Sequence, residues 1–311
     1  MKINEVHNSL LNEMYYDIDH PSGLKILIMP KAGYSSTYAI FATKYGSIDT
    51  MIQMKDGSFR EIPEGTAHFL EHKLFECEDL DAFERFAKTG ASANAYTSFD
   101  RTGYLFSCSD NFKENLEILL DFVQNPYFTQ ATVEKEQGII GQEIDMYKDV
   151  PDWEVMFNCL RNMYHNLPVR IDIAGTQESI AQITADMLYD CYNNFYNLNN
   201  MVLAIAGNTT VDEVLEVADR MLKPVEGKMA QRKLIDEPRD VISDYCEKKL
   251  SVATPQFMIG FKEEWDTPER TAKEEITMEI LLDMISGPSS DLYRRLFESN
   301  PVSYTHLRAH E

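Results

Sequence analysis

The most constraining feature of the sequence is the segment His68-Phe69-Leu70-Glu71-His72. On a helix, which turns about 100° per residue, His68 and His72 lie one turn apart and Glu71 projects beside them. Two neutral imidazoles can hold Zn²⁺ with one further protein ligand, which leaves the fourth position for a water molecule. The segment therefore predicts a short helix that carries part of a zinc site, with Glu71 as general base rather than ligand.

The residues around this segment also follow a helical pattern. Ala67, Leu70 and Leu74 recur at i, i+3 and i+7, so one face is apolar and the histidines occupy the neighbouring sector. Thr66 is the expected N-cap of this helix. The alternative is a surface helix on which two histidines and a glutamate meet by chance and bind no metal.

A second helix is expected over residues 131–148. Glu136 and Glu143 are seven residues apart and lie almost in line on one face, beside Ile139 and Ile140. A carboxylate without a partner on an apolar face is costly, so each glutamate needs a cation or a hydrogen-bond donor. The plain alternative is a helix whose glutamates pair with lysine or arginine.

Strand-like and helix-like segments are interspersed along the first two thirds of the chain. The expected strands are residues 24–29, 38–44, 91–98, 104–108 and 201–206. The expected helices, besides the two above, are residues 81–87, 112–124, 152–165, 184–195 and 211–222. This order predicts the α+β class: a layered domain with a mainly antiparallel sheet covered by helices. Residues 1–20 give no clear assignment.

A change of character near Pro224 marks a domain boundary. We expect residues 1–226 to form the zinc-binding domain and residues 227–300 an incomplete second domain of similar fold. Within the second domain, residues 256–261 are an expected strand and residues 270–285 an expected helix that contains no histidine.

Residues 301–311 match neither part, and we expect a non-native tail. His306 and His310 within this tail are four residues apart and precede Glu311, which gives a second metal hypothesis. The terminal position and the lack of a third ligand in view disfavour it.

Composition restricts the partners and the compartment. The formal net charge of −22 disfavours nucleic acid and anionic membrane, since both reward basic patches. The five cysteines form no C-x-x-C pair, which fits reduced thiols in a cytoplasmic protein. The sequence shows neither a membrane-spanning apolar run nor a secretory signal.

The order H-x-x-E-H is the signature of the inverzincins, and the segment Glu64 to Phe75 resembles the pitrilysin, insulinase and mitochondrial processing peptidase family. The resemblance extends over roughly residues 18–298. It implies that Glu143, about seventy residues beyond His72, is the third ligand of one zinc ion per chain. It also implies that Glu136 is an accessory catalytic carboxylate that supports the metal ligands.

The resemblance further implies two similarly folded domains and an edge strand to which a peptide substrate is added. Asn94 and Ala95 are then substrate contacts. The expected function is a zinc-dependent endopeptidase that hydrolyses extended or unfolded peptides, either alone or as a homodimer or heterodimer with a related chain. The alternatives are a non-catalytic scaffold or substrate-recognition subunit, and a structural zinc domain with four closed protein ligands.

Overall fold

The computed structural model describes residues 1–54, 56–224, 231–233, 235–252, 255–262 and 271–298. The chain divides into two compact units, residues 1–262 and residues 263–311. The boundary expected after residue 226 and the tail expected over residues 301–311 stay predictions. The tail and its histidines lie outside the described residues.

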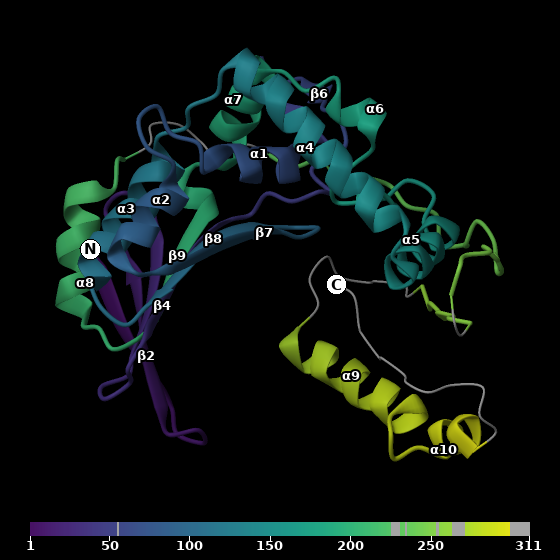
Figure 1. The fold of residues 1–311 in the computed structure, drawn as a ribbon. Helices are drawn as coiled ribbons and strands as arrows, with labels where there is room; N and C mark the ends of the chain where they lie inside the picture. Colours follow the sequence, from purple (N-terminus) through teal and green to yellow (C-terminus); the bar gives the residue numbers. More distant parts are fainter. Residues whose placement is uncertain (55, 225–230, 234, 253–254, 263–270, 299–311) are drawn as a thin grey trace. The chain divides into compact units, whose positions relative to one another are not determined.

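A sheet of seven strands, counted within the described residues, forms the scaffold of the first unit (Figure 1). Its strands are β1 (Lys2–Asn8), β2 (Glu13–Asp19), β3 (Lys25–Pro30), β4 (Thr37–Thr43), β7 (Ser92–Thr97), β8 (Thr102–Cys108) and β9 (Met201–Gly207). They lie in the order β1-β2-β3-β9-β4-β8-β7, and β3 with β9 is the one parallel pair among them. A separate two-stranded sheet joins β5 (Met51–Gln53) to β6 (Phe59–Glu61).

Helices lie over one face of this sheet, with α2, α3 and α8 over one part and α1, α4 and α7 over another (Figure 1). The helices of the first unit are α1 (Thr66–Leu74), α2 (Ala82–Thr89), α3 (Phe112–Gln124), α4 (Gln130–Lys148), α5 (Pro151–Met163), α6 (Gln177–Ile180), α7 (Ala185–Phe195) and α8 (Val211–Met221). The prediction of a mainly antiparallel sheet covered by helices is confirmed.

The first two strands form a hairpin that the sequence did not reveal. Most of their side chains are exposed or half-buried, and in β1 none is buried. The hydrophobic alternation that identifies a half-buried strand is therefore absent. Ile18 is the buried anchor, since it pairs with Ile26 of β3 in the sheet core.

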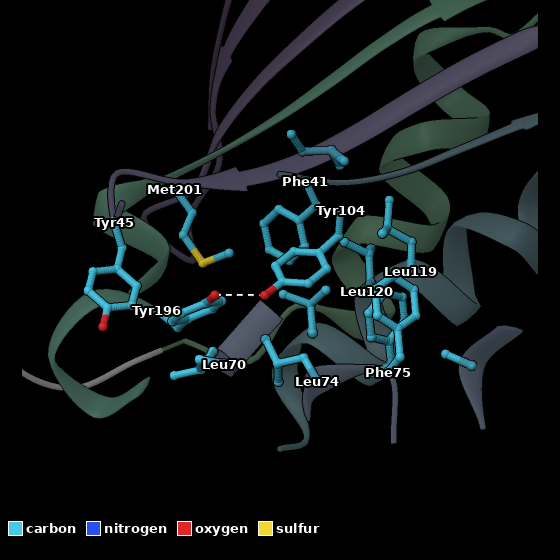
Figure 2. Close-up of a cluster of buried hydrophobic side chains, with 14 of the residues drawn as sticks. Phe41, Tyr45, Leu70, Leu74, Phe75, Tyr104, Leu119, Leu120, Tyr196 and Met201 are labelled. Carbon is cyan, nitrogen blue, oxygen red and sulfur yellow. Dashed lines mark hydrogen bonds between the residues drawn. The ribbon is translucent and has the colours of Figure 1, made fainter. Parts of the chain in front are cut away.

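The core lies between the sheet and the helices, and Figure 2 shows its centre. Leu70 and Leu74 of α1 and Leu119 of α3 pack beneath the strand residues Phe41 and Met201. Each of these five side chains is less than one tenth exposed. Two tyrosines that close this core, Tyr104 and Tyr196, join their hydroxyl groups at 2.8 Å. Each buried hydroxyl thereby has a partner, as burial of a polar group requires.

The first turn of α1 depends on two glycines. Gly65 is the N-cap with φ 84°, and a Cβ there would lie 2.3 Å from the carbonyl oxygen of Ala174. Gly175, with φ 74°, makes the reciprocal approach to the carbonyl oxygen of Glu64. The prediction that Thr66 caps the helix is wrong, because Thr66 is its first residue and its hydroxyl donates to the carbonyl of Pro63. The two backbone segments cross in close contact at Gly65 and Gly175, and this glycine crossing sets the start of α1 instead.

The segment 256–261 is not a strand, so that prediction is also wrong. A strand needs a neighbour to satisfy its backbone groups, and in the described part of the chain none pairs with this segment. Gly260 instead packs against the sulfur atoms of Cys159 and Met163 on α5.

The second unit, taken by itself, contains α9 (Ala272–Ser286) and α10 (Asp291–Glu298). Thr271 and Glu274 form a capping box at the start of α9. Throughout the described ranges of the whole chain, no helix is both long enough and apolar enough to cross a membrane.

Candidate metal centre

Helix α1 holds His68 and His72 in place by burying the opposite side of its surface. Ala67, Leu70 and Leu74 are at most 3% exposed, as the helical stripe predicts. The two imidazole rings lie 4.5 Å apart between centroids on the side that faces α4. The helix therefore presents both rings in one direction from a fixed base.

Helix α4 brings Glu143 to the same place. One of its carboxylate oxygens lies 3.8 Å from Nε2 of His68, and the other lies 3.6 Å from Nε2 of His72. Each of the three residues offers one ligand atom within 4.8 Å of the other two, and among the described residues this is the one such group. Two imidazoles and one carboxylate are a common ligand set of catalytic zinc.

The electrostatic surroundings of the two rings also suit a cation. Burial and the neighbouring His72 lower the pKa of His68 to about 3, so this ring is neutral at neutral pH. Its Nδ1 atom is buried and has no hydrogen-bond partner in the part of the chain that the structure describes. Burial opposes charge on His72 too, but Glu136 and the other carboxylates outweigh it and raise the pKa of that ring. A neutral imidazole and an imidazole whose neighbouring carboxylates favour positive charge thus lie side by side, and residues of these types fit a zinc ion.

Glu136 lies behind the ligand group rather than within it. Its Oε1 is 2.9 Å from Nδ1 of His72, on the side of the ring away from Glu143. A carboxylate in this position fixes the tautomer and the orientation of a metal-binding imidazole. The supporting role that the family resemblance implies for Glu136 stays a prediction.

Glu71 is separate from the ligand group and almost buried, with 8% of its surface exposed. Burial raises the pKa of its carboxyl group, and a hydrogen bond from Thr97 and the proximity of His72 oppose this rise. The hydroxyl of Thr97 donates to Oε2 of Glu71 at 2.7 Å. A carboxylate beside a metal position, but outside the ligand set, is suited to accept a proton from water.

Asn94 and Ala95 lie on β7, the last strand of the sheet order, which contacts α1. The free edge of β7 has no strand beside it among the described residues. Asn94 is exposed, and its side-chain oxygen accepts the backbone N–H of Ala95 at 2.9 Å. An unpaired strand edge beside the site is a suitable place for an extended peptide.

Two residues near the site were not identified from the sequence. Thr97 faces α1 because it follows Ala93 and Ala95 at alternate positions of β7, a signal that was present in the sequence. Burial is the largest cause of the raised pKa of Glu143, and the nearby negative charge of Asp172 raises it further. Asp172 also accepts the indole N–H of Trp153. No sequence pattern marks Asp172, because the glycine crossing at Gly175 brings its segment there.

Comparison with known proteins gives two matches to family models. The model described as Insulinase (Peptidase family M16) matches residues 47–177, and the model described as Peptidase M16 inactive domain matches residues 182–305. The first of these ranges contains His68, Glu71, His72 and Glu143.

Similar chains carry related names. The uncharacterized zinc protease YmfH of Bacillus subtilis (strain 168) is 44% identical over 309 residues, which cover 97% of this chain and 72% of that protein. The mitochondrial-processing peptidase subunit beta of Bos taurus is 36% identical over 160 residues, which cover 50% of this chain and 32% of that one.

Solved structures agree with the fold. The crystal structure of an M16-like peptidase from Alicyclobacillus acidocaldarius has a TM-score of 0.81 and 37% identity, and the match covers 96% of this chain and 69% of that chain. A protease structure from Helicobacter pylori, at 18% identity and a TM-score of 0.73, supports the fold alone. The extent of the YmfH match and the site on α1 and α4 lead to one conclusion: this chain belongs to the insulinase family, peptidase family M16.

Proposed function

We propose that this protein is a zinc-dependent endopeptidase that hydrolyses extended or unfolded peptides with a metal-activated water. The observation that carries the proposal is the approach of both Nε2 atoms, of His68 and His72, to the two oxygens of Glu143, with Glu71 close by and outside the group. The names of the related zinc proteases support it.

His68, His72 and Glu143 would hold one zinc ion per chain. When bound, the ion would polarise the scissile carbonyl and lower the pKa of a water molecule beside it. Glu136 keeps Nδ1 of His72 engaged, so that Nε2 of the same ring stays directed at the ligand position.

Glu71 acts as general base and then as general acid. Its Oε2 is occupied by the hydroxyl of Thr97, which leaves Oε1 to take the proton of the attacking water. The same carboxyl group then delivers this proton to the leaving amine. Because burial raises the pKa of this carboxyl group, its proton affinity is greater than that of a solvated glutamate.

The peptide would lie along β7 as an additional strand. Its backbone would pair with the free edge near Asn94 and Ala95, and the side-chain oxygen of Asn94 would release the N–H of Ala95 to the peptide. Only an extended backbone can pair in this way, so folded proteins should be poor substrates.

We further propose that the protein pairs with a second chain and is cytoplasmic. The relative from Bos taurus is named as a subunit, which supports pairing of this protein with a second copy or a related chain. Sedimentation of the purified chain measures this directly. All five cysteines, each within the described residues, are free thiols, in keeping with a cytoplasmic location, which stays a prediction.

The test is to measure the zinc content and hydrolysis of a quenched, unstructured peptide before chelation, after it and after zinc is restored. We expect about one zinc per chain, loss of hydrolysis with the metal, and recovery with zinc. Hydrolysis that survives complete removal of the metal would contradict the proposal. One bound zinc without hydrolysis would instead favour the non-catalytic subunit.

A further inference from the structure

One side-chain hydrogen bond joins β7, the proposed peptide-binding strand, to α1, the helix that carries the proposed general base. Thr97 is the last residue of β7, and its hydroxyl donates to Oε2 of Glu71 on α1 at 2.7 Å. The strand β7 presents the edge for the peptide, while α1 carries the general base. Thr97 therefore lies between the place where a peptide would bind and the group that would transfer the proton.

The position of the Glu71 carboxylate depends on this single donor. Within the described part of the chain, Thr97 provides the one hydrogen bond that Glu71 accepts, and the other oxygen accepts none. A glutamate side chain has several rotatable bonds, and fixing them costs conformational entropy. Without the hydroxyl, packing alone would restrict the carboxylate.

Thr97 itself is firmly held. It is paired in register with Thr102 of β8, whose buried hydroxyl donates to the carbonyl of Tyr45 at 2.8 Å. The turn that connects the two strands is closed by the N–H of Ser98, which donates to the carbonyl of Arg101 at 2.8 Å. A hydrogen-bond donor at such a rigid strand end can hold a catalytic group in the precise position that catalysis needs.

The turn that follows Thr97 is also held by hydrogen bonds from a second segment of the chain. The backbone N–H of Ser47 donates to the carbonyl of Ser98, and that of Ile48 donates to the carbonyl of Phe99. Gly46 permits this close approach, since a Cβ there would lie 2.3 Å from the carbonyl oxygen of Phe99. The turn after Thr97 is thereby fastened to the loop that follows β4.

We propose that Thr97 is a positioning residue that holds Oε2 of Glu71, so that Oε1 points to the attacking water. The inference rests on the proposed function, because it assigns a purpose to the orientation of Glu71. It predicts an effect on turnover rather than on substrate binding, since the Thr97 side chain faces α1 and not the free edge of the strand. It also predicts no effect on zinc binding, because within the described residues the Thr97 hydroxyl bonds to Glu71 and to none of the three ligand residues.

Thr97→Val removes the hydroxyl but keeps the shape, and Thr97→Ser keeps the hydroxyl. We expect Thr97→Val to lower kcat by roughly 10–100-fold at unchanged KM and zinc content, because a catalytic group misplaced by about 1 Å can slow a reaction by about a hundredfold. Thr97→Ser should retain most of the activity. Thr89→Val is the matched control, because the Thr89 hydroxyl also bonds within the fold, to Phe86 and Asn115, and lies outside the site.

Crystal structures of the zinc-loaded variants provide a measurement that does not need activity. The Glu71 carboxylate should keep its position in Thr97→Ser and leave it in Thr97→Val. If the natural chain hydrolyses no peptide and the carboxylate still moves only in Thr97→Val, the proposed function fails and the positioning role stands.

Three results would overturn the positioning role itself. The first is a Glu71 carboxylate that stays in place in Thr97→Val. The second is a serine variant as impaired as the valine variant. The third is an active enzyme in which Thr97→Val lowers kcat no more than Thr89→Val does.

Discussion

Nδ1 of His72 lies 2.9 Å from Oε1 of Glu136, and Nε2 of the same ring lies 3.6 Å from Oε2 of Glu143. The imidazole thus lies between the Glu136 carboxylate, which orients the ring, and the Glu143 carboxylate, which is proposed to bind the same zinc ion. His68 has no such support within the described residues, because its buried Nδ1 has no hydrogen-bond partner there. Packing on α1 orients His68, and Glu136 orients His72.

Replacing Glu136 should therefore weaken the metal site without destroying it. We expect Glu136→Gln to reduce zinc affinity or activity by roughly 10–100-fold, because the amide orients the ring less well than a carboxylate does. Competition with a chromophoric chelator measures the affinity. Glu134→Gln is the control, since Glu134 is exposed and contacts Gln130 on another face of α4. An equal loss in both variants would mean that Glu136 has no special role.

Glu143→Gln should have a larger effect than Glu136→Gln. A ligand carboxylate supplies both an oxygen donor and a negative charge to the metal, and we expect its loss to strip zinc from the purified protein. Metal analysis of the two variants side by side checks this. If Glu136→Gln lost the zinc and Glu143→Gln kept it, the ligand would lie two turns earlier on α4 than we propose.

Proline at Ala95 tests the edge of β7. Proline is tolerated at a sheet edge but removes the N–H that the peptide backbone would accept. We expect Ala95→Pro to lower kcat/KM by about threefold to tenfold, the value of one neutral hydrogen bond, at full zinc content. Ala95→Ser keeps the N–H and should behave as the natural chain. Identical peptide kinetics in a folded Ala95→Pro protein would place the substrate elsewhere.

An acid-sensitive contact lies outside the site, at Glu237. Its carboxylate pairs with Lys262 at 2.6 Å and accepts the backbone N–H groups of His165, Asn166 and Leu167. Burial alone would raise the pKa of Glu237, but the ammonium group and the three donors outweigh it and hold this pKa at about 2.

Because the folded-state pKa lies below the ordinary value of 4.5, the stability from Glu237 is present above pH 4.5 and is lost as the pH falls toward 2. Glu237→Gln should lower the free energy of unfolding by about 3 kcal/mol at pH 7, since it removes the ion pair of Lys262 and leaves that ammonium group with backbone carbonyls alone as hydrogen-bond acceptors. Urea unfolding at pH 7, 5 and 3 measures the difference in unfolding free energy between the natural chain and Glu237→Gln. This difference should fall by about half or more between pH 5 and pH 3. A difference in unfolding free energy that does not change with pH would contradict this role of the Glu237 carboxylate.

The sequence predicted the elements whose patterns are local. The ends of α3 were predicted to the residue, and the helices expected over residues 184–195 and 211–222 are present as α7 and α8. Thr184 and Thr210 are the N-caps of these two helices, a position that threonine favours. His68 and His72 could be identified because a spacing of four residues on one helix places two side chains next to each other. Glu143 was placed through a family resemblance, since no local rule connects two helices about seventy residues apart.

The features that escaped prediction depend on distant contacts. The hairpin of β1 and β2 has little buried surface, so its pattern is weak. The cap of α1 is set by Gly65 against Ala174, more than a hundred residues away. The partner of Glu71 was visible only as an alternate residue of β7, and alternation alone does not say which helix a strand residue meets.

Glu71 is proposed to contact the attacking water and not the metal, and Glu71→Gln tests this role most directly. The measurement is zinc content and hydrolysis of a quenched, unstructured peptide for Glu71→Gln, with His68→Ala and His72→Ala as the matched ligand variants. We predict about one zinc per chain and no detectable hydrolysis for Glu71→Gln, and loss of both for the histidine variants. A Glu71→Gln protein that has lost its zinc, or one that keeps both zinc and full hydrolysis, would contradict the account.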